Sequence, residues 1–157
     1  MATNLLAVGD KAPAITLVDQ HGDKRTLKEF GGRKVLVFFY PKADTPGCTT
    51  QACGLRDIAD GVGDTQIIGI SPDTPDKQGR FDEKYDLGYP LLADVDHKVA
   101  EKYGAWREKN MYGKKSMGIA RSTFIIDADG RVATVFKAVK VDGHADQVLA
   151  ALGESRP

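Results

Sequence analysis

Cys48 and Cys53 are the residues of this sequence whose type and close spacing could do chemistry. Two cysteines are too few for a disulfide-stabilised scaffold, and too few for a zinc site built from four cysteines. The three histidines lie far from the pair along the chain, at His21, His97 and His144. The sequence therefore predicts no metal site and no cofactor. It leaves two interpretations of the cysteines, inert core residues or reactive thiols.

Cys48 lies where a buried strand is expected to meet a helix. Residues 35–40, VLVFFY, are continuously apolar, which is typical of a strand buried on both faces. Thr45 followed by Pro46 predicts a helix start, with the threonine capping free N–H groups and the proline in the first position. Cys48 then falls in the first turn, where the helix dipole and unpaired N–H groups favour a thiolate. Gly47 has no side chain and should leave the approach to Cys48 open. The alternative is a small buried hydrophobic residue.

Cys53 follows five residues later, on the same expected helix. In an intact α-helix the Cα atoms of residues i and i+5 are ~8.7 Å apart and ~140° apart around the axis. A disulfide needs Cα atoms closer than ~7 Å. The two cysteines can therefore bond only if this helix unwinds locally. Thr49, Thr50 and Gly54 are mediocre or poor helix formers, so the segment is weak enough for that.

The remaining elements predict an α/β fold, a three-layer sandwich on a mixed central sheet, formed as a single domain over residues 1–157. The expected order is a hairpin within 13–27, three strand–helix units that start near 35, 66 and 90, a hairpin over 123–136, and a helix after Gly143. The first of these helices should end near Asp60, before Gly61 and Gly63, and Asp96 should cap the third. Residues 105–119 show no clean period and are expected to form a long surface loop. That loop would carry three solvated lysines, and two histidines near helix starts should be exposed: Lys109, Lys114, Lys115, His97 and His144.

The composition excludes several classes of partner. Lysine and arginine number 22 and aspartate and glutamate 22, so no basic excess exists to bind nucleic acid or an anionic membrane. No apolar run approaches the ~20 residues that span a bilayer. Residues 1–9 lack both a basic region and a long apolar region, so no signal peptide is predicted. These features favour a cytoplasmic protein without a membrane or nucleic-acid partner.

The segment around the cysteines carries a specific pattern. Pro41-x-x-x-Thr45-x-x-Cys48 resembles the active-site motif of the peroxiredoxins, and Cys53 five residues later resembles their bacterioferritin-comigratory-protein or peroxiredoxin Q branch. The resemblance covers nearly the whole chain. Further stretches that fit this branch are GDKAPAITL at 9–17, YGAW at 103–106, MYG at 111–113 and RSTFIID at 121–127.

The resemblance implies a thioredoxin-like fold and the reduction of hydrogen peroxide and organic hydroperoxides. Cys48 would be the peroxidatic cysteine and Cys53 the resolving cysteine. Thr45 and Arg121 would be pocket residues, and Pro41 would shield the pocket wall. Cys48 would become a sulfenic acid, which Cys53 would resolve as an intramolecular disulfide. Thioredoxin or a similar dithiol would then reduce the disulfide, and the protein would act as a monomer.

Two other functions remain open from the sequence. A thioredoxin-like disulfide reductase usually has two residues between its cysteines, whereas four separate Cys48 from Cys53. A peroxide-sensing protein could use the same disulfide as a switch with slow turnover, and the sequence does not distinguish it from a peroxidase.

Overall fold

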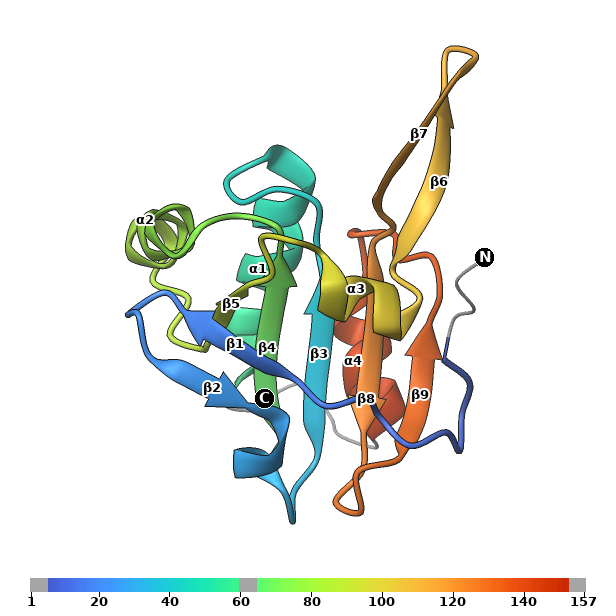
Figure 1. The fold of residues 1–157 in the computed structure, drawn as a ribbon. Coiled ribbons are helices and arrows are strands. Elements are labelled where there is room, and N and C mark those ends of the chain that lie inside the picture. Colours follow the sequence, from blue (N-terminus) through green and yellow to red (C-terminus); the bar gives the residue numbers. More distant parts are fainter. Residues whose placement is uncertain (1–5, 60–64, 153–157) are drawn as a thin grey trace.

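A seven-stranded mixed sheet forms the centre of the computed structural model, which describes residues 6–59 and 65–152. Its strand order is β2–β1–β5–β4–β3–β8–β9 (Figure 1). β3, β4 and β5 are parallel, while β8 and β1 flank them in antiparallel pairs. The predicted mixed sheet is confirmed. Its strands are β1 (Thr16–Asp19), β2 (Lys24–Thr26), β3 (Val35–Phe39), β4 (Gln66–Ser71), β5 (Leu91–Ala93), β8 (Ser122–Ile126) and β9 (Val132–Phe136).

Apolar side chains of β3 point to both faces of this sheet and create two cores. Val37 and Phe39 join the cluster that contains α3 (Lys98–Tyr103), whereas Leu36 and Phe38 join the cluster that contains α1 (Pro46–Ile58). Residues of α2 (Pro75–Tyr85) and α4 (His144–Leu152) belong to the second cluster. The sheet is therefore the middle of three layers, as predicted. Burying each of these large side chains contributes roughly 1.5–3 kcal/mol.

The helix starts follow the predicted chemistry with two exceptions, one at α3 and one at α1, where Thr45 is at the N-cap position without a side-chain cap. Thr74 caps α2 by accepting a hydrogen bond from the Lys77 amide, ahead of the proline at the first helical position. Asp96 was expected to cap α3 and accepts only the amide of Lys98, at 3.3 Å, while the carboxylate of Asp94 accepts the amides of Val99 and Ala100, at 3.2 and 2.9 Å. Asp94 reaches over the start of the helix because His97, the residue before α3, has a left-handed backbone with φ of 52°.

The expected surface loop over 105–119 is wrong, because this segment forms a β-hairpin. β6 (Trp106–Met111) pairs antiparallel with β7 (Lys114–Ile119), and the ribbon projects away from the main sheet (Figure 1). Tyr112 and Gly113 connect the strands, with φ of 54° and 78°. Two positive φ values at the two central residues are typical of a type I′ turn, which matches the twist of a two-residue hairpin.

The last part of α1 was predicted to extend to about Asp60. In the structure α1 ends at Ile58, with Ala59 as its C-cap, and the glycines expected to stop it lie outside the described residues. Within residues 6–59 and 65–152, no helix combines the length and hydropathy needed to cross a membrane.

Candidate active site

Cys48 is the third residue of α1, in the first helical turn as predicted. Its thiol is free, and the residue is fully buried, at 0% exposed. It packs in the core cluster beside Tyr40, the residue that follows β3. A backbone amide in the first helical turn has no acceptor within the helix, so it can donate to an anion near the sulfur. The turn thus combines a free thiol with an electropositive backbone.

Thr45 stands at the N-cap position of α1, but its side chain does not cap the helix. Its hydroxyl donates to the carbonyl of Lys42, at 2.8 Å, instead of accepting an amide. The position was predicted correctly and the hydrogen bond was not, because the side chain turns back into the loop between β3 and α1. With its proton committed to Lys42, the Thr45 oxygen has lone pairs free to accept a hydrogen bond.

Arg121 lies directly before β8 and reaches the first turns of α1. Its Nη1 donates to Oε1 of Gln51, at 2.8 Å. A Cβ atom placed on Gly47 would lie 3.2 Å from Nη2 of the same arginine. Gly47, which was predicted to leave the approach to Cys48 open, also provides the room in which the guanidinium packs against α1.

Gln51 is a site residue that the sequence analysis missed. It lies three residues after Cys48, is 2% exposed, and uses its amide oxygen to hold Arg121. Its amide nitrogen Nε2 has no hydrogen-bond partner among the described residues. The spacing i, i+3 from Cys48 placed it near the same helix face, which was the available signal.

The loop that precedes Cys48 is fixed from the side of β4 and α2. The amide of Ala43 donates to the carboxylate of Asp73 at 2.7 Å, and Ser71 also donates to Asp73.

Asp44, in the same loop, has a left-handed backbone, with φ of 60°. Its carboxylate accepts from the hydroxyl of Tyr85 at 2.7 Å and from Lys84 at 2.9 Å. Both hydrogen bonds lower the pKa of Asp44, and the one from Tyr85 has the larger effect. Pro41 begins the loop and is half-buried.

Cys53 lies one and a half turns after Cys48 on the same continuous helix, half-buried and with a free thiol. The second half of α1 is attached to its neighbours, since the hydroxyl of Tyr89 donates to the carbonyl of Ala52 at 2.8 Å. Arg56 donates to the carbonyl of Tyr85. The intact helix keeps the two cysteines apart, at the ~8.7 Å that regular helix geometry requires.

The arrangement has close counterparts among known proteins. The model of the AhpC/TSA family matches residues 8–135. The chain belongs to this family. Peroxiredoxin Bcp of Escherichia coli K12 is 50% identical over 148 residues, which cover 93% of this chain and 95% of that protein. The predicted resemblance to the peroxiredoxins of the Bcp branch is therefore confirmed, and with it the class of peroxidases.

Solved structures of this AhpC/TSA branch share the fold. The bacterioferritin comigratory protein of Xanthomonas campestris, studied for its alkyl peroxide reduction activity, is 37% identical with a TM-score of 0.84, over 88% of this chain and 90% of that one. Peroxidoxin BcpB of Mycobacterium tuberculosis is 39% identical with a TM-score of 0.82, over 93% of this chain and 96% of that one. The thioredoxin-like fold predicted from the resemblance is confirmed.

Other features of this peroxiredoxin lie apart from Cys48. A hollow of about 610 Å³ between β1 and α2 is lined by Gln20, Arg80 and Asp82, and it does not include the cysteine. In the part of the chain that the structure describes, no three His, Cys, Asp or Glu residues come together as metal ligands would.

His144 was expected to be exposed, but it is 2% exposed and forms a hydrogen bond with Thr123 at 2.9 Å. Burial, the largest cause, lowers the pKa of His144.

Proposed function

We propose that this protein is a thiol peroxidase whose nucleophile is Cys48. The thiolate attacks the terminal oxygen of a hydroperoxide, the O–O bond breaks, and the product is a Cys48 sulfenic acid. The departing alkoxide or hydroxide takes up a proton and leaves as an alcohol or water. The observation that carries this proposal is the position of Cys48 in the first turn of α1, between Gly47 and Gln51, which both contact the guanidinium of Arg121.

Charge stabilisation, more than ionisation of the thiol, accounts for the expected rate. Complete ionisation of an ordinary thiol at neutral pH raises its thiolate fraction only about thirtyfold. The leaving oxygen gains negative charge as the O–O bond stretches, and donors aimed at that charge are worth ~10²–10³ each in rate. Arg121 and the amide of Cys48 are such donors. The Thr45 oxygen accepts a hydrogen bond from the hydroperoxide O–H and orients the substrate. Pro41 and Gly47 form the wall of the pocket.

Resolution requires α1 to open. Cys53 attacks the sulfenic sulfur of Cys48, an S–S bond forms, and water leaves with the sulfenic oxygen. The helix must first unwind around residues 47–54, because its regular geometry holds the two Cα atoms too far apart. A dithiol protein of the thioredoxin class then supplies two electrons and two protons, which restore both thiols. We propose that the protein does this as a monomer in the cytoplasm, as a single domain over 1–157.

The deciding experiment is a steady-state assay with hydrogen peroxide, thioredoxin and thioredoxin reductase, followed through consumption of the reductase's reduced nicotinamide cofactor. A peroxidase turns over many equivalents of peroxide at a rate proportional to enzyme. A peroxide sensor forms the disulfide once and then turns over slowly. A disulfide reductase reduces a test disulfide, such as that of insulin, without peroxide. Either of the last two results would contradict the proposal.

A further inference from the structure

Lys109 is the hairpin lysine whose side chain turns back toward the base of the hairpin. Lys109 pairs with Ser116 in the register of β6 and β7, whereas Gly118 lies two residues nearer the base of the hairpin. A Cβ atom on Gly118 would lie 3.4, 3.5 and 3.8 Å from Cδ, Cε and Nζ of Lys109. The aliphatic part of the Lys109 side chain therefore lies across Gly118. Its ammonium points toward the base of the hairpin, from which the chain continues to Arg121.

The base of the hairpin is firmly attached to the main fold. The ring of Trp106 stacks on that of His97, with centroids 3.7 Å apart. Arg107 donates to the carbonyls of Gly104 and Lys137, at 2.7 and 3.0 Å. The amide of Ala120 donates to the carbonyl at 105, at 2.7 Å. These contacts fix the direction in which Lys109 points.

The direction of the stem, toward Gly118 and the chain that continues to Arg121, brings the Lys109 ammonium close enough to Arg121 and Cys48 to interact with their charges. Burial is the largest cause that lowers the pKa of Lys109, and the positive charge of Arg121 lowers it further, while the negative charge of Cys48 acts in the opposite direction. Lys114 and Lys115, on the same hairpin, are exposed. Within residues 6–59 and 65–152, no carboxylate forms an ion pair with Lys109. The expectation that this residue is an ordinary solvated lysine is therefore wrong.

We propose that Lys109 is a specificity-determining residue that favours hydroperoxides with a carboxylate near the –OOH group. The proposal rests on the proposed role of Cys48 as the peroxidatic cysteine. When Cys48 is a thiolate, its charge balances one of the two cations, Arg121 and Lys109, and one positive charge is left over. A neutral hydroperoxide leaves that charge unmatched, whereas a carboxylate on the substrate neutralises it in a partly desolvated site.

The reaction itself is unchanged for such a substrate. The Cys48 thiolate takes the terminal oxygen, the O–O bond breaks, and the alkoxide of a hydroxy acid leaves and takes up a proton. Lysine suits this role because its ammonium is a compact charge on a flexible stem, which can follow carboxylates at somewhat different distances from the hydroperoxide. Arg121, fixed by Gln51, serves the reacting oxygens instead.

A matched pair of substrates tests the assignment. Single-turnover rates of hydroperoxide consumption are measured for a β-hydroperoxy carboxylic acid, its methyl ester and hydrogen peroxide. The readout is the acid-to-ester rate ratio, in which any change in the thiolate fraction of Cys48 or in the amount of folded protein cancels. Lys109→Met keeps most of the apolar stem and removes the charge. Lys114→Met is the control on the same hairpin, and Lys109→Arg retains the charge.

In Lys109→Met we expect the acid-to-ester ratio to fall roughly fivefold to thirtyfold, the effect of two unit charges about 8 Å apart at an effective dielectric constant of about 20–40. Lys114→Met should change the ratio less than about twofold, because exposed charges are screened. Lys109→Arg should restore most of it. Gly118→Val, which forces the Lys109 stem away, should lower the ratio in the same direction.

An unchanged ratio in Lys109→Met overturns this inference while leaving the peroxidase intact, since hydrogen peroxide would still be consumed. An equal fall in Lys114→Met also overturns it, because the effect would then be general attraction to the hairpin. If the unmodified protein consumed none of the three hydroperoxides, the proposed function would fail, and this inference with it.

Discussion

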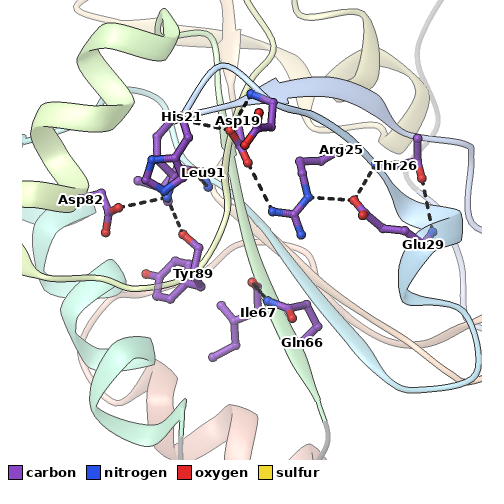
Figure 2. A network of polar contacts seen from close by, with 12 residues as sticks. Asp19, His21, Arg25, Thr26, Glu29, Gln66, Ile67, Asp82, Tyr89 and Leu91 are labelled. Carbon is purple, nitrogen blue, oxygen red and sulfur yellow. Dashed lines mark hydrogen bonds and ion pairs between the residues drawn. The ribbon is translucent and has the colours of Figure 1, made fainter.

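Two polar regions of the molecule differ in how completely their groups are satisfied. Around the N-terminal hairpin, the buried carboxylate of Asp19 accepts the amides of His21 and Asp23 and a guanidinium hydrogen of Arg25, at 2.8, 3.0 and 3.2 Å (Figure 2). Arg25 lies between two carboxylates and also donates to Glu29, at 2.8 Å. Each charge in this network has a partner inside the fold.

The part of α1 around Cys48 leaves polar groups unpaired. Gln51 Nε2 and Thr49 Oγ1 are buried and have no hydrogen-bond partner among the described residues. Buried polar groups are rarely left unpaired in folded proteins, because each costs about 1–3 kcal/mol. The network at Asp19 therefore stabilises the fold, whereas the unpaired groups beside Cys48 cost stability, a cost that a bound hydrogen-bonding partner can offset. We therefore expect substitutions around Asp19 to change stability and substitutions around Cys48 to change activity.

The largest effect is expected from Cys48→Ser. A serine hydroxyl is about as large as a thiol but is a far weaker nucleophile at neutral pH, so peroxide consumption should be abolished. The fold should persist, as judged by circular dichroism and thermal unfolding. A variant that consumed hydrogen peroxide at a rate close to that of the unmodified protein would show that Cys48 is not the nucleophile.

Cys53→Ser should stop turnover after the first equivalent of peroxide. The sulfenic acid at Cys48 would then have no internal thiol to attack it, and excess peroxide would oxidise it further. Mass spectrometry of the peroxide-treated unmodified protein should show a loss of two hydrogens, with Cys48 linked to Cys53. A stable sulfenic acid beside a free Cys53 thiol would contradict resolution by this residue.

The same oxidation should also be visible in the helix. Amides from about residue 47 to residue 55 should lose hydrogen-exchange protection in the oxidised protein, because the linked cysteines cannot coexist with regular α1. Amides of β3 serve as the internal reference, since that strand is buried on both faces. Unchanged protection across α1 in a protein shown to carry the disulfide would overturn the unwinding step.

Arg121→Ala and Arg25→Ala compare the two regions directly. Arg121→Ala should slow peroxide reduction ~10²–10³-fold, because one donor to the developing charge is lost. Raising the pH until the thiol is fully ionised should not restore the rate. Arg25→Ala should leave the rate unchanged and lower the free energy of unfolding by about 1–3 kcal/mol, since Asp19 loses a charged partner. If the rate of Arg121→Ala recovered fully at high pH, the arginine would act only by favouring the ionised form of Cys48.

Local signals in the sequence were sufficient for the elements that position Cys48. The apolar run of β3 is confirmed over Val35–Phe39, and Thr45–Pro46 marks the start of α1. Both signals act within a few residues of the chain. The cap of α3 was predicted only in part, because Asp96 accepts a single amide. The other two amides bond to Asp94, which lies four residues before the helix and reaches it through the left-handed backbone of His97.

Contacts between distant segments explain the other errors. Gln51 and Arg121 are 70 residues apart, so their hydrogen bond leaves no local pattern. His144 is buried by Thr123 and by Phe136, whose ring lies 5.2 Å away and edge-on. The hairpin over 106–119 was missed because its strands are polar. Its turn also has Tyr112 where Asn or Asp usually supplies the first positive φ.

The smallest expected effect concerns the pH dependence of stability at Asp19. Burial by itself would raise the pKa of this carboxyl, but the backbone hydrogen bonds of Asp23 and His21 and the contact with Arg25 outweigh it and lower the pKa. A carboxyl whose pKa is lower in the folded than in the unfolded state binds protons first when unfolded. Its contribution to stability is therefore complete above the unfolded pKa of about 3.9 and is lost as the pH falls through the lower folded value.

Asp19→Asn removes this titration while keeping nearly the same shape. Relative to the unmodified protein, the variant should be about 1.5–3 kcal/mol less stable at neutral pH, the usual value of hydrogen bonds to a charged group. The difference in the free energy of unfolding by urea between Asp19→Asn and the unmodified protein should stay constant down to about pH 5 and then narrow. Asp23→Asn, an exposed change in the same turn, is the control and should show no comparable gap. A gap that widened on acidification would reverse the sign of the argument, and a loss of peroxide consumption in Asp19→Asn would show that the two polar regions are not independent.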